Sequence, residues 1–147
     1  GWVLGVEVLS DGRLLSYSED STLRLWNVAD GSLFHTLEGH TGSARGVEVL
    51  SDGRLLSYSR YDRTVRIWDG GDGSLLHTLE GHTGEVNGAE VLSDGRILSY
   101  SFDGTLRLWN GDDGTLLHTL TGHTDIVDGV EIKCRTSYSL LYSPGFS

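Results

Sequence analysis

Histidines that directly follow a glycine recur along the chain, and they are the first candidates for chemistry. His40, His82 and His123 lie 42 and 41 residues apart. Neutral imidazole is a common metal ligand and general base. Each of these histidines belongs to a different copy of a repeated segment. The spacing therefore indicates a structural role in each copy rather than one shared metal or catalytic centre.

A second histidine series, His35, His77 and His118, has the same spacing. We expect these side chains on the outermost strand of each repeat, where neighbouring repeats diverge. Equivalent ring nitrogens would then lie too far apart to share one metal ion, whose bonds to nitrogen are about 2 Å long. Solvated histidines are the simpler interpretation.

Acidic loops and serines are the remaining groups with chemical potential. Residues 69–73 and 110–114 form acidic, glycine-rich loops, but neither has the Asp-x-Asp-x-Asp-Gly spacing or the closing glutamate of a calcium loop. Serines are frequent, yet no Gly-x-Ser-x-Gly nucleophile elbow appears. We therefore expect hairpin turns in these loops, and no metal, no cofactor and no enzymatic activity.

A long repeat organises all of these residues. Residues 5–18 and 46–59 share the sequence GVEVLSDGRLLSYS, and residues 88–101 differ from it at two positions. Trp26, Trp68 and Trp109 follow the same period of 41 or 42 residues. Self-similarity at this period is typical of repeat architectures. The units are predicted at 1–38, 39–80 and 81–121, with part of a fourth at 122–147.

Each unit reads as four short strands. In the second unit we expect strands at residues 46–50, 55–59, 64–68 and 75–79. Asp-Gly pairs between apolar runs, such as Asp52-Gly53, favour tight hairpin turns. No segment has helical periodicity. Four antiparallel strands per unit predict an all-β fold of β-propeller blades.

These motifs resemble those of the WD-repeat family of β-propellers over residues 1–132. The resemblance is carried by the Gly-His pairs, by an aspartate in the turn before the third strand, and by Trp68-Asp69 with its variants Trp26-Asn27 and Trp109-Asn110. In that family a buried polar network links the histidine, a second-strand serine, the turn aspartate and the tryptophan. The implied networks are His40, Ser57, Asp62 and Trp68 in the second unit, and His82, Ser99, Asp103 and Trp109 in the third. The first unit offers Ser16, Asp20 and Trp26 without an upstream histidine, and the fourth offers only His123.

Positions that differ between the units are candidates for a partner-binding face. The resemblance implies that the residue before the turn aspartate and the residue before the inner-strand glycine face the top of the ring. Protein contacts favour exposed aromatic and arginine side chains. The alternative is drift without a selected partner. The candidate residues are Glu19, Tyr61, Phe102, Arg45, Asn87 and Asp128.

The repeat is lost near the C-terminus. We expect an inner strand at residues 127–132 and a second strand at residues 138–143. One permitted set of codons for residues 133–142, read one base later, encodes SAGRRILSY, which is close to SDGRILSY of the third unit. This match suggests a frameshift in a longer array, a hypothesis that the coding DNA would test.

Charge and composition exclude some classes of partner and indicate a cellular location. The net charge of −10 argues against nucleic acids and anionic membranes. Cys134 is the single cysteine, and neither a signal peptide nor a membrane-spanning stretch is visible, so we expect a cytoplasmic protein.

Three blades cannot close a ring, because propellers have about four to eight. We therefore expect the chain to pair with itself as a homodimer, with eight blade positions preferred to six because the fourth unit also needs a place. A trimer is the weaker alternative. The predicted function is a non-enzymatic scaffold or protein-interaction module. The alternatives are a repeat-amplification fragment or engineered assembly without a dedicated ligand, and a lectin-like propeller, which would need recurrent aromatic pockets that Tyr61 and Phe102 supply only loosely.

Overall fold

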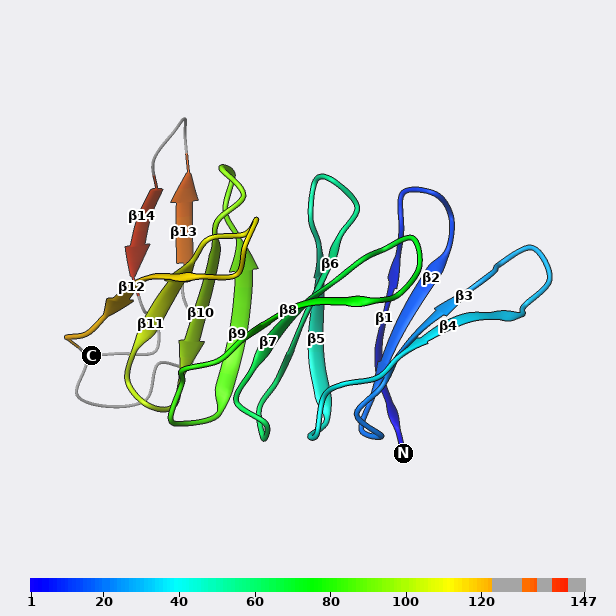
Figure 1. Ribbon diagram of the computed structural model, residues 1–147, viewed down its shortest axis with the longest axis horizontal. Helices are drawn as coiled ribbons and strands as arrows, with labels where there is room; N and C mark the ends of the chain where they lie inside the picture. Colours follow the sequence, from blue (N-terminus) through cyan, green and yellow to red (C-terminus); the bar gives the residue numbers. More distant parts are fainter. Residues whose placement is uncertain (123–130, 135–138, 143–147) are drawn as a thin grey trace.

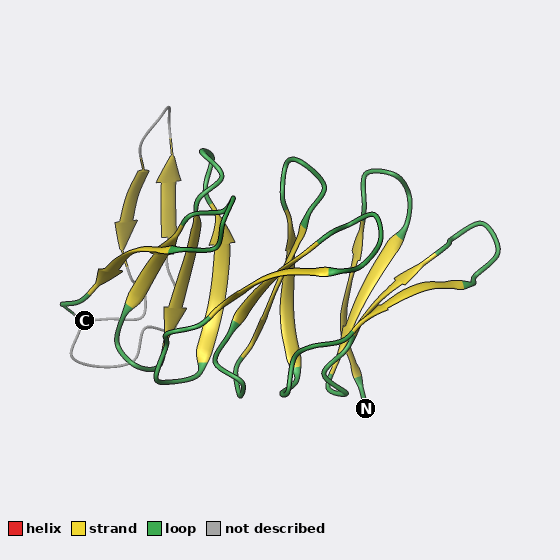
Figure 2. Cartoon of the chain, in the orientation of Figure 1, coloured by secondary structure: helices red, strands yellow, loops and turns green. Residues whose placement is uncertain are grey.

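A computed structural model of the chain describes residues 1–122, 131–134 and 139–142. The described residues form strands, turns and loops without helix, so none of them lies in a helix able to cross a membrane (Figure 2). Three sheets of four antiparallel strands follow one another in chain order (Figure 1). Within each sheet the strands are also in chain order, as expected for propeller blades.

The strand boundaries repeat from sheet to sheet. Sheet 1 contains β1 (Val3–Val8), β2 (Leu14–Ser18), β3 (Leu23–Trp26) and β4 (Leu33–Leu37). Sheet 2 contains β5 (Ala44–Val49), β6 (Leu55–Ser59), β7 (Val65–Trp68) and β8 (Leu75–Leu79). Sheet 3 contains β9 (Val86–Val91), β10 (Ile97–Ser101), β11 (Leu106–Trp109) and β12 (Leu116–Leu120).

A further hairpin lies in the predicted fourth unit. β13 (Glu131–Cys134) pairs antiparallel with β14 (Ser139–Tyr142). β14 falls inside the second strand expected at 138–143. The inner strand was expected at 127–132, but residues 127–130 lie outside the described residues and β13 continues to Cys134.

The turn chemistry explains why the first two strands of each sheet form a hairpin. Gly53 has a φ of 89°, which glycine adopts without steric cost. Asp52 accepts hydrogen bonds from the backbone N–H and the Nε of Arg54, at 3.1 and 2.8 Å. The Asp-Gly-Arg sequence therefore closes the turn with its own side chains.

The inner strand of the second unit begins earlier than expected. β5 starts at Ala44, whereas the sequence suggested that Gly46 marks its beginning. Gly46 instead lies inside the strand opposite Tyr58, and a Cβ at this position would overlap the Tyr58 ring. The glycine is needed for the close approach of an aromatic ring and does not end the strand.

Strand alternation gives each sheet two different faces. The tryptophan face of sheet 2 carries Val47, Leu55 and Trp68, and its opposite, aliphatic face carries Leu56, Val65 and Ile67. The aliphatic face of sheet 1 packs on the tryptophan face of sheet 2 in one core cluster. The aliphatic face of sheet 2 packs on the tryptophan face of sheet 3 in the next.

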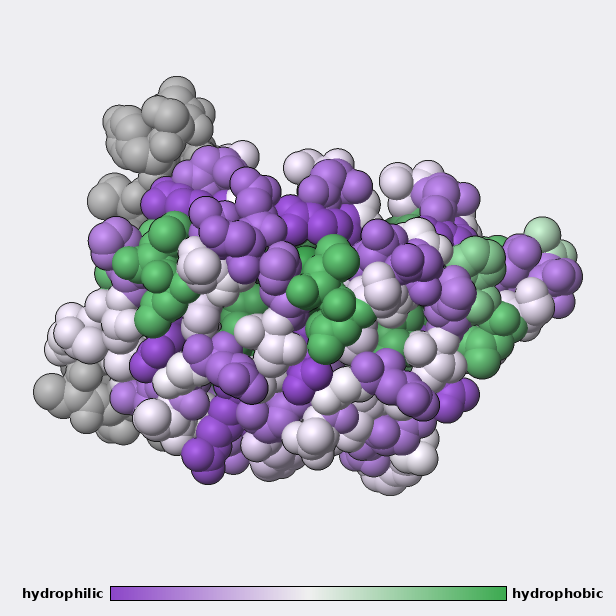
Figure 3. Space-filling view, viewed as in Figure 1, coloured by the Kyte–Doolittle hydropathy of each residue, from purple (hydrophilic) through white to green (hydrophobic). Residues whose placement is uncertain are grey.

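The outermost strands expose apolar pairs that recur around the rim. One face of the molecule shows apolar groups set among polar atoms in Figure 3. Separate, small apolar pairs of this kind are normal on protein surfaces. Each member of these pairs is between 39% and 47% exposed: Leu33 and Phe34, Leu75 and Leu76, and Leu116 and Leu117.

A strained turn position gives the first testable prediction. Ser21, Arg63 and Gly104 occupy the same place after the turn aspartate, with φ values of 74°, 63° and 83°. A left-handed backbone costs a residue with a Cβ about 1–2 kcal/mol. Glycine avoids this cost but loses more conformational entropy on folding, so the net gain in stability is smaller. Arg63→Gly is therefore expected to raise the free energy of unfolding by about 0.5–1 kcal/mol.

Urea unfolding of wild type, Arg63→Gly and Arg63→Ala at one protein concentration checks this prediction. Alanine removes the same side chain but keeps the Cβ, so it should bring no comparable gain. Equal stability of the two variants would show that the backbone strain is not relieved by glycine.

Candidate functional site

The side chains expected to form a network in sheet 2 lie in hydrogen-bond contact. Nδ1 of His40 is 2.7 Å from Oδ2 of Asp62, and Nε2 of His40 is 2.7 Å from Oγ of Ser57. The indole N–H of Trp68 donates to the same Ser57 oxygen at 2.8 Å. The network thus joins the loop before β5 to β6, to the β6–β7 turn and to β7.

Sheet 3 repeats this arrangement with nearly the same distances. His82 lies 2.9 Å from Asp103 and 2.7 Å from Ser99, and Trp109 donates to Ser99 at 2.9 Å. His82, Ser99 and Trp109 are all buried. Buried polar groups of this kind are stabilising only when each finds a partner, and these do.

The ionisation of Asp103 and His82 sets the direction of the hydrogen bonds. Burial alone would raise the pKa of Asp103, but hydrogen bonds from Thr105, from His82 and from the Thr83 N–H outweigh it and lower the pKa to about 2. Burial lowers the pKa of His82 and outweighs the opposing effect of Asp103. A neutral His82 then donates from Nδ1 to the Asp103 carboxylate and accepts the Ser99 proton at Nε2.

The order of contacts matches that of a serine-histidine-aspartate catalytic triad, but the environment differs. In serine hydrolases the serine Oγ faces the substrate. Ser57 and Ser99 are fully buried, at 0% exposure, and each Oγ already accepts a tryptophan N–H. Neither oxygen can reach a substrate, so these networks hold strands together.

Sheet 1 contains only part of the network. Trp26 donates to Ser16 at 2.9 Å, as in the other sheets. Asp20 is exposed and accepts from the backbone N–H and the hydroxyl of Thr22, without a histidine partner. His123 of the fourth unit lies outside the described residues.

Five of the six residues expected on a partner-binding face lie in the described part of the chain, and they divide into two groups. Arg45, Asn87 and Phe102 line one pocket between sheets 2 and 3. Tyr61 and Glu19 are exposed but do not line this pocket, and Asp128 lies outside the described residues.

Sequence reasoning missed two residues of this pocket, Arg60 and Tyr58. The second unit reads Ser-Arg-Tyr-Asp at the end of β6, one residue longer than Ser-Glu-Asp and Ser-Phe-Asp in the other units. That insertion was the available signal for Arg60. Tyr58 gave no signal, because a tyrosine stands at this position in all three units.

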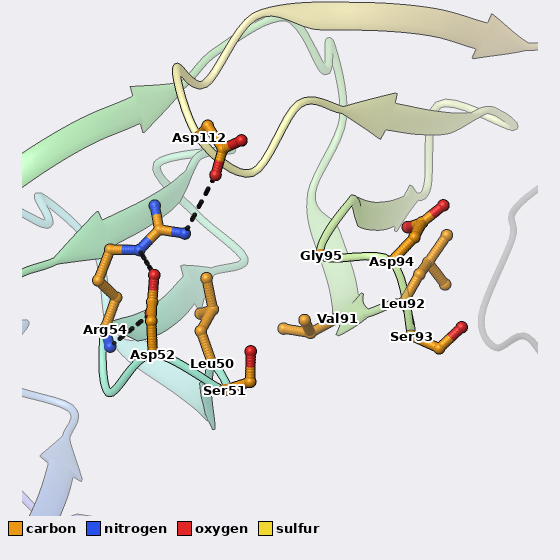
Figure 4. A pocket seen from close by; sticks show the side chains of 10 residues that line it. All are labelled: Leu50, Ser51, Asp52, Arg54, Val91, Leu92, Ser93, Asp94, Gly95 and Asp112. Carbon is orange, nitrogen blue, oxygen red and sulfur yellow. Dashed lines mark hydrogen bonds and ion pairs between the residues drawn. The ribbon is translucent and has the colours of Figure 1, made fainter.

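A second pocket, of about 430 Å³, lies at the β5–β6 and β9–β10 turns (Figure 4). Arg54 donates to the Gly111 carbonyl at 2.6 Å, pairs with Asp52, and lies 3.8 Å from Asp112. Arg54 therefore ties the turn of sheet 2 to sheet 3.

The acidic loops are hydrogen-bonded to themselves. Asp69 accepts from the Gly71 and Asp72 N–H groups, and Asp72 accepts from the Ser74 N–H. Nε2 of His77 lies 3.1 Å from the carbonyl of Asp112. Within the part of the chain that the structure describes, no group of three or more His, Cys, Asp or Glu side chains could hold a metal ion.

The sheets and their networks define the class as a β-propeller fragment, and comparison with known proteins identifies the family. The model described as "WD domain, G-beta repeat" matches residues 1–27, 31–69 and 73–110. The chain belongs to the WD-repeat family. A search of curated proteins gives no match.

A solved structure shares the fold. The crystal structure of the WD40 β-propeller domain of Doa1 is similar with a TM-score of 0.74 and 30% sequence identity. The similarity covers 88% of this chain but 44% of that one, so the chain spans less than half of the structure that it matches.

Proposed function

We propose that the protein is a non-enzymatic scaffold for protein interactions, and that it closes its propeller by pairing with a second copy of itself. WD40 propellers are generally interaction scaffolds, and the chain holds about three blades of that fold. The observation that carries the self-association is the uncovered tryptophan face of sheet 1.

The exposed fractions locate this face. Val6 is 53% exposed, whereas Val47 at the same place in sheet 2 is 8% exposed. Trp26 is half-buried, whereas Trp68 and Trp109 are 1% and 2% exposed. Apolar side chains in this pattern are stabilised when another blade covers them.

The same chain offers a surface of the matching kind. Twice within the molecule an aliphatic face packs on the tryptophan face of the next sheet. Successive blades are nearly identical in sequence. The aliphatic side of the C-terminal unit of one copy is therefore suited to cover the tryptophan face of sheet 1 of another. Applied twice around a two-fold axis, this contact closes a ring.

The hairpin β13–β14 favours eight blade positions over six. Its strands pair as the first two strands of a fourth unit would. Two copies then supply six complete sheets and two partial ones. A six-blade ring would instead place this hairpin and the partner's sheet 1 in the same position.

Solution mass tests the self-association. One chain has a mass of 16.0 kDa, so light scattering at micromolar concentration should give about twice that value. Val6→Asp places a charge on the uncovered face and is expected to shift the protein to the monomer, because burying an unpaired charge is costly.

Leu76→Asp is the matched control. Leu76 is 39% exposed and lies on β8, the outermost strand of sheet 2, and not on the tryptophan face of sheet 1. It should leave the mass unchanged. A wild-type protein that stays at the monomer mass, or equal behaviour of the two variants, would contradict closure by a second copy.

One observation favours the alternative of a fragment without a dedicated ligand. Residues 5–18 and 46–59 are identical, which is typical of recent repeat amplification. Such a fragment would self-associate equally well, so binding of a further partner has to be tested separately.

A further inference from the structure

The pocket between sheets 2 and 3 combines cationic, polar and aromatic groups. It has a volume of about 370 Å³. Its lining comes from β5, from β9, and from the ends of β6 and β10: Arg45, Tyr58, Arg60, Asn87 and Phe102. Two guanidinium groups in one small pocket are notable in a chain with a net charge of −10.

The two arginines are held differently. Arg45 is exposed, and no ion pair among the described residues involves it. The guanidinium of Arg60 lies 5.1 Å from the Phe102 ring centre, and its Nε lies 3.2 Å from the carboxylate of Glu85 without a hydrogen bond. Phe102 and Glu85 therefore position Arg60 at the wall of the pocket.

The wall of the pocket adds a hydroxyl donor. Burial, followed by nearby tyrosines and glutamates, raises the pKa of Tyr58 to about 12. A tyrosine hydroxyl is protonated at neutral pH even without this shift, so Tyr58, which lines the pocket, can donate a hydrogen bond to an anion there.

The first junction lacks this chemistry although its core is nearly the same. Leu4 stands where sheet 2 has Arg45, and Glu19 is the only residue between Ser18 and the turn aspartate, in the segment that holds Arg60 in sheet 2. The pocket is therefore not a by-product of the repeat. It arises where one unit departs from the others.

We propose that this pocket binds an acidic side chain of a partner peptide, with an apolar neighbour of that residue against Phe102. The proposal specifies the partner class of the interaction scaffold and rests on that function, but not on self-association, because one chain supplies every lining residue. Paired guanidinium groups suit a carboxylate.

A single negative charge fits better than a doubly charged phosphate. Glu85 already offsets part of the charge on Arg60, and the whole chain repels extended polyanions. The attraction between one glutamate or aspartate and the two arginines acts over a short distance, and salt screens the more distant acidic residues of the chain. An otherwise neutral or basic peptide with one such residue can therefore bind.

Peptide titration followed by NMR tests the proposal. The probes are three blocked peptides, Gly-Leu-Xaa-Leu-Gly, in which Xaa is glutamate, glutamine or phosphoserine. The glutamate peptide is expected to bind at least about tenfold more tightly than the glutamine peptide and to shift the side-chain amide signal of Asn87. Arg45→Leu, which installs the residue of the first junction, should abolish that preference.

Arg63→Leu is the control, since Arg63 is exposed nearby but does not line the pocket. It should bind as wild type does. Equal binding of the glutamate and glutamine peptides would overturn the proposal, and tighter binding of the phosphoserine peptide would replace the carboxylate by a phosphate. Light scattering on the same samples measures self-association. A protein that does not self-associate can therefore be distinguished from one whose pocket does not bind the peptide.

Discussion

Trp68→Ala is expected to lower the free energy of unfolding by about 3–5 kcal/mol, as large-to-small changes of buried aromatics do. Trp68 is 1% exposed and belongs to the core cluster between sheets 1 and 2. The substitution also removes the N–H that donates to Ser57. The cost therefore combines a cavity at a blade junction with the loss of one arm of a buried network.

Two further variants separate these contributions. Trp68→Phe fills part of the volume but has no N–H, so it should cost clearly less than alanine. Trp26→Ala removes the same side chain from sheet 1, where it is half-buried and its network lacks a histidine. A smaller loss is expected there.

Urea unfolding monitored by circular dichroism at one protein concentration measures these differences. Trp26 lies on the face proposed to contact a second copy. The solution mass of each variant is therefore also measured by light scattering. Unchanged stability of Trp68→Ala would mean that the junction between sheets 1 and 2 contributes little to the fold.

The sequence was sufficient for the framework of this protein. The identical segments predicted the strands of sheets 1 and 2, and the Asp-Gly pairs predicted their hairpin turns. The spacing of His40, Asp62 and Trp68 selected the residues that the structure brings together. Such periodic signals survive in a sequence because each blade must satisfy the same packing and hydrogen-bonding requirements.

Other features depend on contacts that have no sequence period. The sequence predicts a strand boundary at Gly46, because the packing of Tyr58 over this glycine is a cross-strand contact without a sequence period. The role of Arg60 depends on Glu85 and Phe102, which belong to the neighbouring sheet. A comparison of equivalent positions finds the residues that differ between units. Only the packing of neighbouring sheets shows which of these side chains contact one another.

Core positions and pocket positions of the repeat therefore follow different rules. Leu55 and Ile97 fill equivalent places in their sheets and are both fully buried. Arg45 and Asn87 are equivalent in sequence, yet they stand on opposite sides of one pocket and differ in chemistry. A repeat protein can acquire a binding site in this way, since changes at a junction do not disturb the packing beneath it.

Asp103→Ala is expected to cost about 2–3 kcal/mol at neutral pH, because it leaves the buried His82 ring N–H and the half-buried donors of Thr105 without an acceptor. The Asp103 carboxylate accepts from Nδ1 of His82, from the Thr83 and Thr105 N–H groups, and from the Thr105 hydroxyl. Asp20→Ala is the matched control in sheet 1, where the aspartate is exposed and has no histidine partner. It should cost clearly less.

The same variant should change how stability depends on acid. The pKa of Asp103 is lowered from 3.8 to about 2 in the folded protein, so folding favours the ionised carboxylate. Its contribution is present above about pH 4 and is lost as the pH falls toward 2. Urea unfolding between pH 2 and pH 5 should therefore show a shallower loss of stability in Asp103→Ala than in wild type. Asp62 has a lowered pKa as well, so part of the acid dependence should remain. Parallel curves for the variant and wild type would show that the Asp103 carboxylate is not held in its ionised form by the network.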